Sequence, residues 1–143
     1  MIYAKKNKIK NYAIEKKKPQ FEKKALSILN KNKINLLCLA GFMRILSKEF
    51  IKKCKFKIIN IHPSLLPKYK GLNTHERAIQ AGDKYAGSTV HYVTAKLDSG
   101  KKILQTKVKI FKSDNPNTLA KRVLKAEHQI YPKAVDIVCK KII

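Results

Sequence analysis

Residues 35–62 read NLLCLAGFMRILSKEFIKKCKFKIINIH and contain two apolar runs with a short amphipathic segment between them. The first run, at 35–40, shows no apolar–polar alternation, which is typical of a strand buried on both faces of a parallel sheet. The segment at 47–54 predicts a short helix with Ser47 as its N-cap, and 57–61 predicts the next strand. Strand, helix and strand joined by short connections form a βαβ unit, which implies a right-handed crossover in a parallel sheet.

The sequence after this unit predicts a helix, a hairpin and a closing helix. A proline-containing loop leads to Thr74, which is expected to cap a helix that Gly82 ends. Residues 87–95 and 102–110 alternate well enough to be two antiparallel strands. A long helix then begins near 115–116, because proline suits the first turn of a helix.

The sequence before the unit is less regular. Apolar residues at helical spacing predict a helix over 21–32, and a weak strand is expected near 10–14. The glycines are too far apart to form a Gly-rich phosphate loop. We therefore expect an α/β fold: the C-terminal part of a doubly wound, Rossmann-like parallel sheet with an antiparallel hairpin and a closing helix. We expect a single domain over 1–143 that is incomplete at its N-terminus.

The composition narrows the possible partners. The chain has 33 Lys and Arg against 9 Asp and Glu, a formal net charge of +24, which favours polyanions. Only three of the basic residues are Arg, however, and the lysines are scattered along the whole chain. An A/T-rich genome explains this composition at least as well, so we do not expect a nucleic-acid partner.

No apolar run approaches the ~20 residues of a membrane span, and no signal-peptide pattern is present. A cytoplasmic protein without membrane contact is expected.

Cysteine and histidine spacing gives no sign of a metal. The three cysteines lack CxxC spacing and are expected to be small buried residues in a reducing compartment. The four histidines lack HExxH or other close spacing. We predict no metal.

Polar side chains follow the two strands of the βαβ unit. In open α/β sheets ligands bind at the carboxyl ends of the strands, which are 41–45 and 60–63 here. Asn60 and His62 project to the same side of an extended segment. Asn can donate to a developing oxyanion, and His can move a proton near neutral pH. Asp98, in the later hairpin turn, is a candidate to orient His62 and stabilise its charged form.

Each of these three residues also has an ordinary structural explanation. Asn60 can cap a strand end, His62 can bond to backbone carbonyls, and Asp98 is a common turn residue. Their spacing alone does not name a reaction. No Ser or Cys lies in a recognisable nucleophile motif. The grouping of Asn60, His62 and Asp98 therefore suggests direct transfer of a group to an incoming nucleophile, without a covalent enzyme intermediate.

Several long motifs resemble the glycinamide ribonucleotide transformylases (phosphoribosylglycinamide formyltransferases). The main ones are LAGFMRIL at 39–46, IINIHPSLLPKYKG at 58–71 and GSTVHYV at 87–93. Shorter ones are LDSG at 97–100, ILQ at 103–105, EH at 127–128 and IYP at 130–132. The resemblance covers about residues 21 to 138. It implies transfer of a formyl group from the co-substrate 10-formyltetrahydrofolate to the amine of glycinamide ribonucleotide in de novo purine biosynthesis.

The resemblance also implies roles for individual residues. Asn60, His62 and Asp98 match the catalytic trio of the family. Five residues fall where the family holds the folate: Phe42, Arg44, Ile45, Leu46 and Leu97. Four fall on the nucleotide side: Met43, Ile61, Pro63 and Glu127. The implied partners are therefore these two small molecules, while the oligomeric state stays open.

The sequence departs from the family in several places. The family begins with a strand and a Gly-Ser-Asn-type phosphate loop, a portion that this sequence lacks, so we expect folate binding to be retained better than nucleotide binding. Ser99-Gly100-Lys101 stands where the family usually has Gly-Gly-Pro. Ala95 and Leu124 replace a usual acidic and a usual polar residue.

Three alternatives stay open. A relative of methionyl-tRNA formyltransferase would suit the charge of +24, but that enzyme normally lacks Pro directly after the His and has a second domain. Formyltetrahydrofolate deformylase resembles the run HYVT at 91–94, whereas PSLL at 63–66 favours the transformylase. A basic nucleic-acid-binding remnant of an enzyme would bind RNA with a steep salt dependence and would not bind folate.

Overall fold

The computed structural model describes residues 2–15 and 17–142, which divide into two compact units, Met1–Ile34 and Asn35–Ile143. The first unit holds α1 (Ile2–Lys6) and α2 (Gln20–Lys31). α2 confirms the helix predicted over 21–32. The strand expected near 10–14 is wrong, because this segment is largely exposed and has no strand beside it to complete its backbone hydrogen bonds. The single domain expected over 1–143 stays a prediction.

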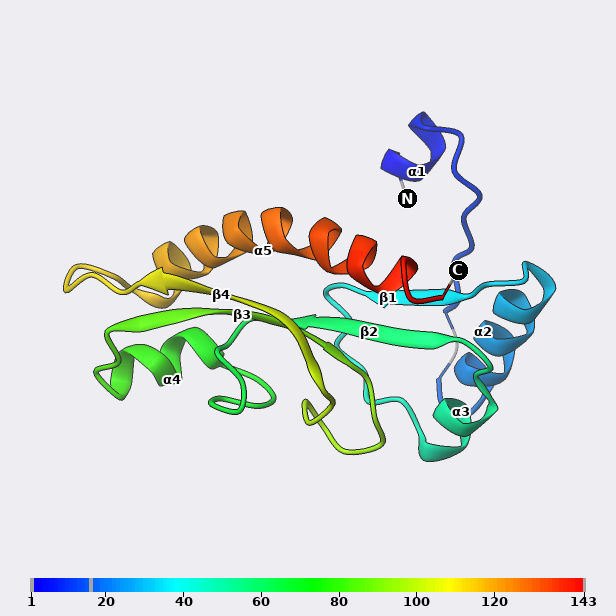
Figure 1. Ribbon diagram of the computed structural model, residues 1–143, viewed down its shortest axis with the longest axis horizontal. Coiled ribbons are helices and arrows are strands. Elements are labelled where there is room, and N and C mark those ends of the chain that lie inside the picture. The colour runs from blue at the N-terminus through cyan, green and yellow to red at the C-terminus, as the bar shows by residue number, and fades with distance from the viewer. Residues whose placement is uncertain (1, 16, 143) are drawn as a thin grey trace. The chain divides into compact units, whose positions relative to one another are not determined.

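The second unit is built on a four-stranded mixed sheet in the order β1-β2-β3-β4 (Figure 1). The strands are β1 (Leu36–Leu39), β2 (Lys57–His62), β3 (Tyr85–Tyr92) and β4 (Lys102–Lys109). β1 and β2 are parallel and are joined through α3 (Lys48–Lys53), which confirms the βαβ unit. β3 is antiparallel to both of its neighbours. The parallel part of the described sheet is therefore confined to β1 and β2.

β1 does not have the predicted burial. It was expected to be covered on both faces, yet its leucines are only half-buried and Cys38 is exposed. β1 lies at an edge of the described sheet, with β2 as its one neighbour. The expectation of buried cysteines is wrong as well, because Cys54 and Cys139 are only partly buried.

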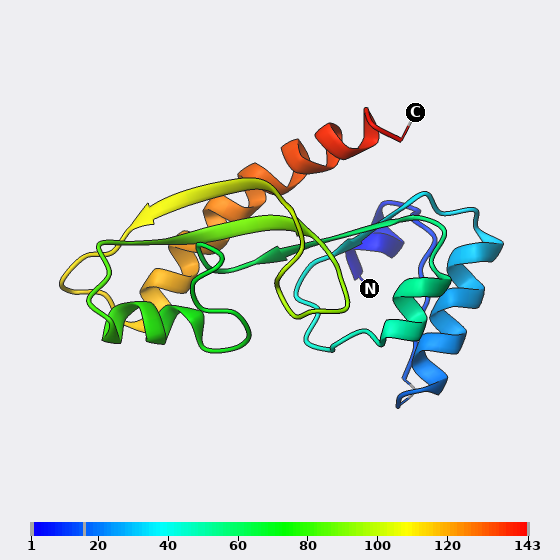
Figure 2. The same ribbon diagram turned by 60° about the horizontal axis from the view of Figure 1, so that its bottom comes forward.

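α5 (Pro116–Cys139) supplies much of the core of the second unit. Asn115 caps it by accepting hydrogen bonds from the backbone N–H groups of the first turn. Leu119 and Val123 pack into one buried cluster with residues of β3 and of α4 (Thr74–Gln80). Ala134 and Val138 pack into a second cluster against β2 and β3. α5 runs along the sheet in Figures 1 and 2.

Two smaller features complete this unit. α4 begins one residue earlier than predicted: Asn73, with a left-handed backbone, is the N-cap, and Thr74, the expected cap, is the first helical residue. Among the described residues, no helix combines the length and the apolar character that crossing a membrane requires.

Candidate active site

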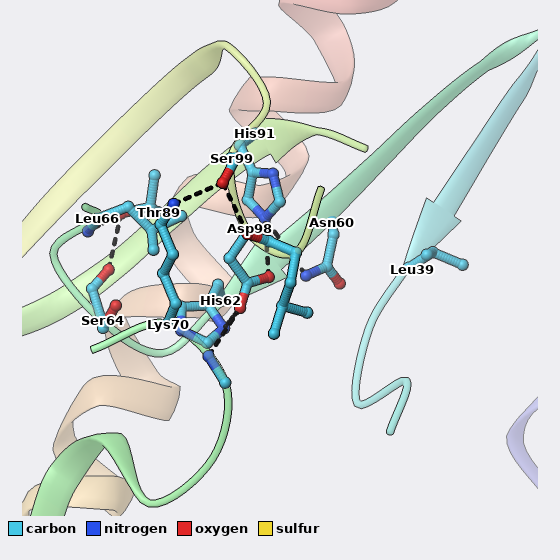
Figure 3. Close-up of polar contacts among 12 residues, drawn as sticks. Leu39, Asn60, His62, Ser64, Leu66, Lys70, Thr89, His91, Asp98 and Ser99 are labelled. Carbon is cyan, nitrogen blue, oxygen red and sulfur yellow. Dashed lines mark hydrogen bonds and ion pairs between the residues drawn. The ribbon is translucent and has the colours of Figure 1, made fainter. Parts of the chain in front are cut away.

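β2 and β3 place three polar side chains next to one another. Asn60 and His62 lie two residues apart on β2, and the antiparallel register sets His91 of β3 directly opposite Asn60. Side chains opposite each other in such a pair lie close together. Asp98 comes from the loop between β3 and β4, and Figure 3 shows its carboxylate between the two imidazole rings.

Three groups lie close to the carboxylate of Asp98. Its Oδ2 lies 3.5 Å from His62 Nδ1 and accepts a hydrogen bond from the Gly71 N–H at 2.9 Å. Its Oδ1 lies 3.6 Å from His91 Nε2. The side chain of Asp98 is only 8% exposed, and its φ of 43° lies in the left-handed region, which Asp tolerates better than most residues. The structure thus brings together the trio named from the sequence.

His62 is oriented by the backbone. Its Nε2 lies 2.9 Å from the carbonyl oxygen of Tyr69. Because a carbonyl only accepts, Nε2 carries the hydrogen and donates it. The neutral ring therefore turns the lone pair of Nδ1 toward Asp98, and a proton taken up at Nδ1 would lie beside a carboxylate. His62 is arranged to accept a proton.

His91 was missed by the sequence reasoning. Its Nδ1 donates to the carbonyl oxygen of Tyr92 at 2.9 Å, so the neutral ring offers Nε2 as an acceptor. Asn60 Nδ2 lies 3.5 Å from that nitrogen. Burial lowers the pKa of His91, an effect that the Tyr92 hydrogen bond and Asp98 partly offset. In this neutral state His91 holds one amide hydrogen of Asn60 and leaves the other for a ligand.

Two further polar residues were missed. Thr89 Oγ1 donates to the Ser64 carbonyl at 2.7 Å and accepts from the Leu66 N–H at 3.1 Å, which fixes the loop that follows His62. His75 borders the larger cavity of the site, and burial together with nearby His62 lowers its pKa. The alternating pattern of β3 could have marked Thr89 and His91 as lying on one face, but only the register shows what they face.

Two cavities meet at Asn60 and Asp98. The larger has a volume of about 580 Å³, within the usual range of small-molecule sites. The smaller has a volume of about 80 Å³, so only one end of a larger ligand would fit inside it. Both are bordered by Asn60 and Asp98. A ligand in either cavity would therefore contact the same polar groups.

The residues expected to bind ligands are divided between the two cavities. All five folate-side residues border the smaller cavity: Phe42, Arg44, Ile45, Leu46 and Leu97. All four nucleotide-side residues border the larger one: Met43, Ile61, Pro63 and Glu127. Phe42, Arg44, Ile45 and Leu97 border both. Their roles in binding stay predictions.

The rims of the cavities carry exposed apolar side chains. Met43 is 76% exposed, Ile45 63% and Leu97 46%. Clustered exposed apolar side chains of this kind are typical of a ligand-binding surface. Within the larger cavity, burial raises the pKa of Glu127. The site thus offers apolar contacts to a ring system and a carboxyl group to a polar ligand.

Gly100 fixes the course of the loop that carries Asp98. A Cβ at this position would lie 1.7 Å from the carbonyl oxygen of Tyr92. We expect Gly100→Ala to lower the free energy of unfolding by about 1–3 kcal/mol, the usual cost of overpacking. Urea denaturation measures this change. Lys101→Ala, at the exposed next position, should change it by less than about 0.5 kcal/mol. Wild-type stability in Gly100→Ala would contradict the clash.

Comparison with known proteins gives consistent matches. Residues 2–135 match the profile of the family described as formyl transferase. The human trifunctional purine biosynthetic protein adenosine-3 is 44% identical over 128 residues, which are 90% of this chain and 13% of that protein. The phosphoribosylglycinamide formyltransferase of Escherichia coli (strain K12) is 48% identical over 102 residues, which are 71% of this chain and 48% of that enzyme.

The fold has a similar match among solved structures. The crystal structure of phosphoribosylglycinamide formyltransferase from Anaplasma phagocytophilum superimposes with a TM-score of 0.92 at 43% identity, covering 98% of this chain and 68% of that chain. This likeness confirms the α/β fold. The chain spans about half the length of its E. coli relative and a much smaller share of the human one.

Proposed function

Because this chain belongs to the formyl transferase family, we propose that it transfers a formyl group from 10-formyltetrahydrofolate to the amine of glycinamide ribonucleotide, in purine biosynthesis. The observation that carries this proposal is the convergence of Asn60, His62 and Asp98 where the two cavities meet. The names of the E. coli and Anaplasma relatives, both phosphoribosylglycinamide formyltransferases, support the same substrates.

The cavities suit the two substrates in different ways. The exposed apolar side chains of Ile45 and Leu97 suit a flat ring system such as the pterin of a folate. The larger cavity has polar groups, among them Glu127, that suit the amide and hydroxyl groups of a ribonucleotide. We assign the smaller cavity and its rim to the folate and the larger one to the nucleotide. The folate supplies the formyl group that is transferred.

Asn60 stabilises developing negative charge in this proposal. When the amine adds to the formyl carbon, the formyl oxygen gains negative charge. The amide hydrogen of Asn60 that His91 does not hold is free to donate to that oxygen. Because Asn60 borders both cavities, its amide is near the place where the two substrates meet. Asn60 acts as the oxyanion donor.

His62 and Asp98 manage the proton. The attacking amine must lose a proton as the new C–N bond forms, and the departing folate nitrogen must gain one as its bond to the formyl carbon breaks. His62 Nδ1 takes up a proton, directly or through water, and Asp98 Oδ2, 3.5 Å away, stabilises the resulting imidazolium. Returning that proton to the departing nitrogen balances the reaction.

Incubation of the chain with both substrates tests the proposal. Mass spectrometry should detect formylated glycinamide ribonucleotide, and its formation should require both 10-formyltetrahydrofolate and the nucleotide. Asp98→Asn is the inactive control and His128→Ala the active one, because His128 is exposed and borders neither cavity. Release of formate at the same rate with and without nucleotide would instead show a hydrolase. Absence of folate binding in calorimetry would also refute the proposal.

A further inference from the structure

We propose that Lys70 is a positioning residue, which through Ser99 holds the loop carrying Asp98 against the segment that follows β2. The Lys70 ammonium donates a hydrogen bond to Ser99 Oγ at 2.5 Å, and Ser99 directly follows Asp98 (Figure 3). The consequence for catalysis rests on the proposed function. The consequence for the position of the Asp98 carboxylate does not.

Three consecutive residues join the two halves of the site. We call Tyr69, Lys70 and Gly71 the clasp. The Tyr69 carbonyl accepts from His62 Nε2 at 2.9 Å, and the Gly71 N–H donates to Asp98 Oδ2 at 2.9 Å. Between them, the side chain of Lys70 reaches the residue after Asp98. The clasp therefore sets the distance between the ring of His62 and the carboxylate of Asp98.

The clasp is itself anchored by contacts with Asp83 and Arg77. The Tyr69 hydroxyl donates to Asp83 Oδ2 at 2.8 Å. Arg77 donates to the Lys70 carbonyl at 2.8 Å, and its guanidinium lies 5.2 Å from the centre of the Tyr69 ring. These contacts fix the backbone from which the Lys70 side chain extends. The Lys70 side chain therefore extends toward Ser99 from a fixed backbone position.

The loop that Lys70 holds has a backbone conformation that needs support. Asp98 has a backbone φ of 43°, a value that residues other than glycine rarely adopt. Its neighbours Leu97 and Ser99 are exposed, so packing restrains them little. Ser99 Oγ donates to the Leu97 carbonyl at 2.8 Å and accepts from Lys70. This bridge spans Asp98 and opposes rotation of its backbone out of the left-handed region.

Nuclear magnetic resonance titration of His91 tests the positioning without any assay of activity. The titratable groups facing His91 are Asp98, which raises its pKa, and His62, which lowers it. In Ser99→Ala and Lys70→Met the carboxylate is released, so the pKa of His91 should fall by about 0.5 unit or more. Lys70→Met also removes a positive charge, which by itself would raise the pKa of His91 and reduce the expected fall. Ser99→Ala changes no charge, so its effect on this pKa reports the release of the carboxylate alone.

Two control variants separate the bridge from general effects. Lys101→Met removes a charge from the same loop, at an exposed position, and should leave the pKa of His91 within about 0.2 unit of wild type. Lys70→Arg keeps a donor at the bridge and should restore most of the wild-type value. A correctly folded Ser99→Ala variant with the pKa of His91 unchanged would overturn the proposal.

Kinetics give the second readout. We expect Lys70→Met and Ser99→Ala each to lower kcat by about tenfold, since small misplacements of a catalytic group are costly, with smaller changes in KM. The double variant should lose no more than the single ones, because both remove the same bridge. Additive losses would overturn the proposal. A shifted His91 pKa in a chain that forms no formylated nucleotide would refute the proposed function and leave the positioning role standing.

Discussion

His62→Ala is expected to lower kcat/KM for formyl transfer by roughly 10²–10⁴, the usual contribution of a positioned general acid or base. In the proposed mechanism the ring accepts the proton at Nδ1, and no other described side chain combines a free ring nitrogen with the 3.5 Å approach to Asp98 Oδ2. Steady-state rates of formation of the formylated nucleotide measure the loss. His128→Ala should keep the wild-type rate, because that ring is exposed and away from both cavities.

Asp98→Asn tests whether His62 and Asp98 act as a pair. The amide keeps the shape of the side chain but removes the negative charge that stabilises a protonated His62, so a loss comparable to that of His62→Ala is expected. Adding His62→Ala to Asp98→Asn should then lower the rate little further, because residues that act as a unit are not additive. Fully additive losses would show that the two residues work independently and that the assigned proton path is wrong.

Asn60→Ala is expected to lower kcat by about 10²–10³, as removal of one oxyanion-hole donor does elsewhere. The amide nitrogen lies 3.5 Å from His91 Nε2, which leaves its second hydrogen for the formyl oxygen. Because this interaction strengthens as negative charge develops, kcat should fall far more than KM rises. Single-turnover measurements with saturating substrates isolate the chemical step.

Asn60→Asp provides the matched variant. It has nearly the volume of Asn60 but no N–H group to donate, so it should be at least as impaired as Asn60→Ala. A rise in KM with kcat unchanged in either variant would mean that Asn60 only binds a substrate and does not stabilise the oxyanion.

The local elements could be predicted from the sequence, because they depend on patterns a few residues long. The period of two in β2 placed Asn60 and His62 on the same side, and the alternation after residue 86 indicated the β3–β4 hairpin. The cap of α3 followed from Ser47, whose side chain accepts from the Phe50 N–H as expected. These features need no knowledge of which strands are neighbours.

What the sequence could not show depends on strand order and register. The exposure of Cys38 follows from the place of β1 at the edge of the described sheet, which no local pattern reveals. The contact of His91 with Asn60 requires the antiparallel register of β2 and β3. Asp98 was paired with His62 from its place in the hairpin turn and from the family resemblance, but the 3.5 Å approach itself depends on the path of a loop, which no local pattern shows.

Both imidazole rings of the site receive their orientation from main-chain atoms. The carbonyl groups of Tyr69 and Tyr92 determine which nitrogen of His62 and of His91 carries the hydrogen. Every amino acid has a carbonyl group, so the identity of the side chains at 69 and 92 is irrelevant to this choice of tautomer. Other residues at these two positions would therefore leave the protonation pattern of the candidate active site unchanged, provided that the backbone keeps its course.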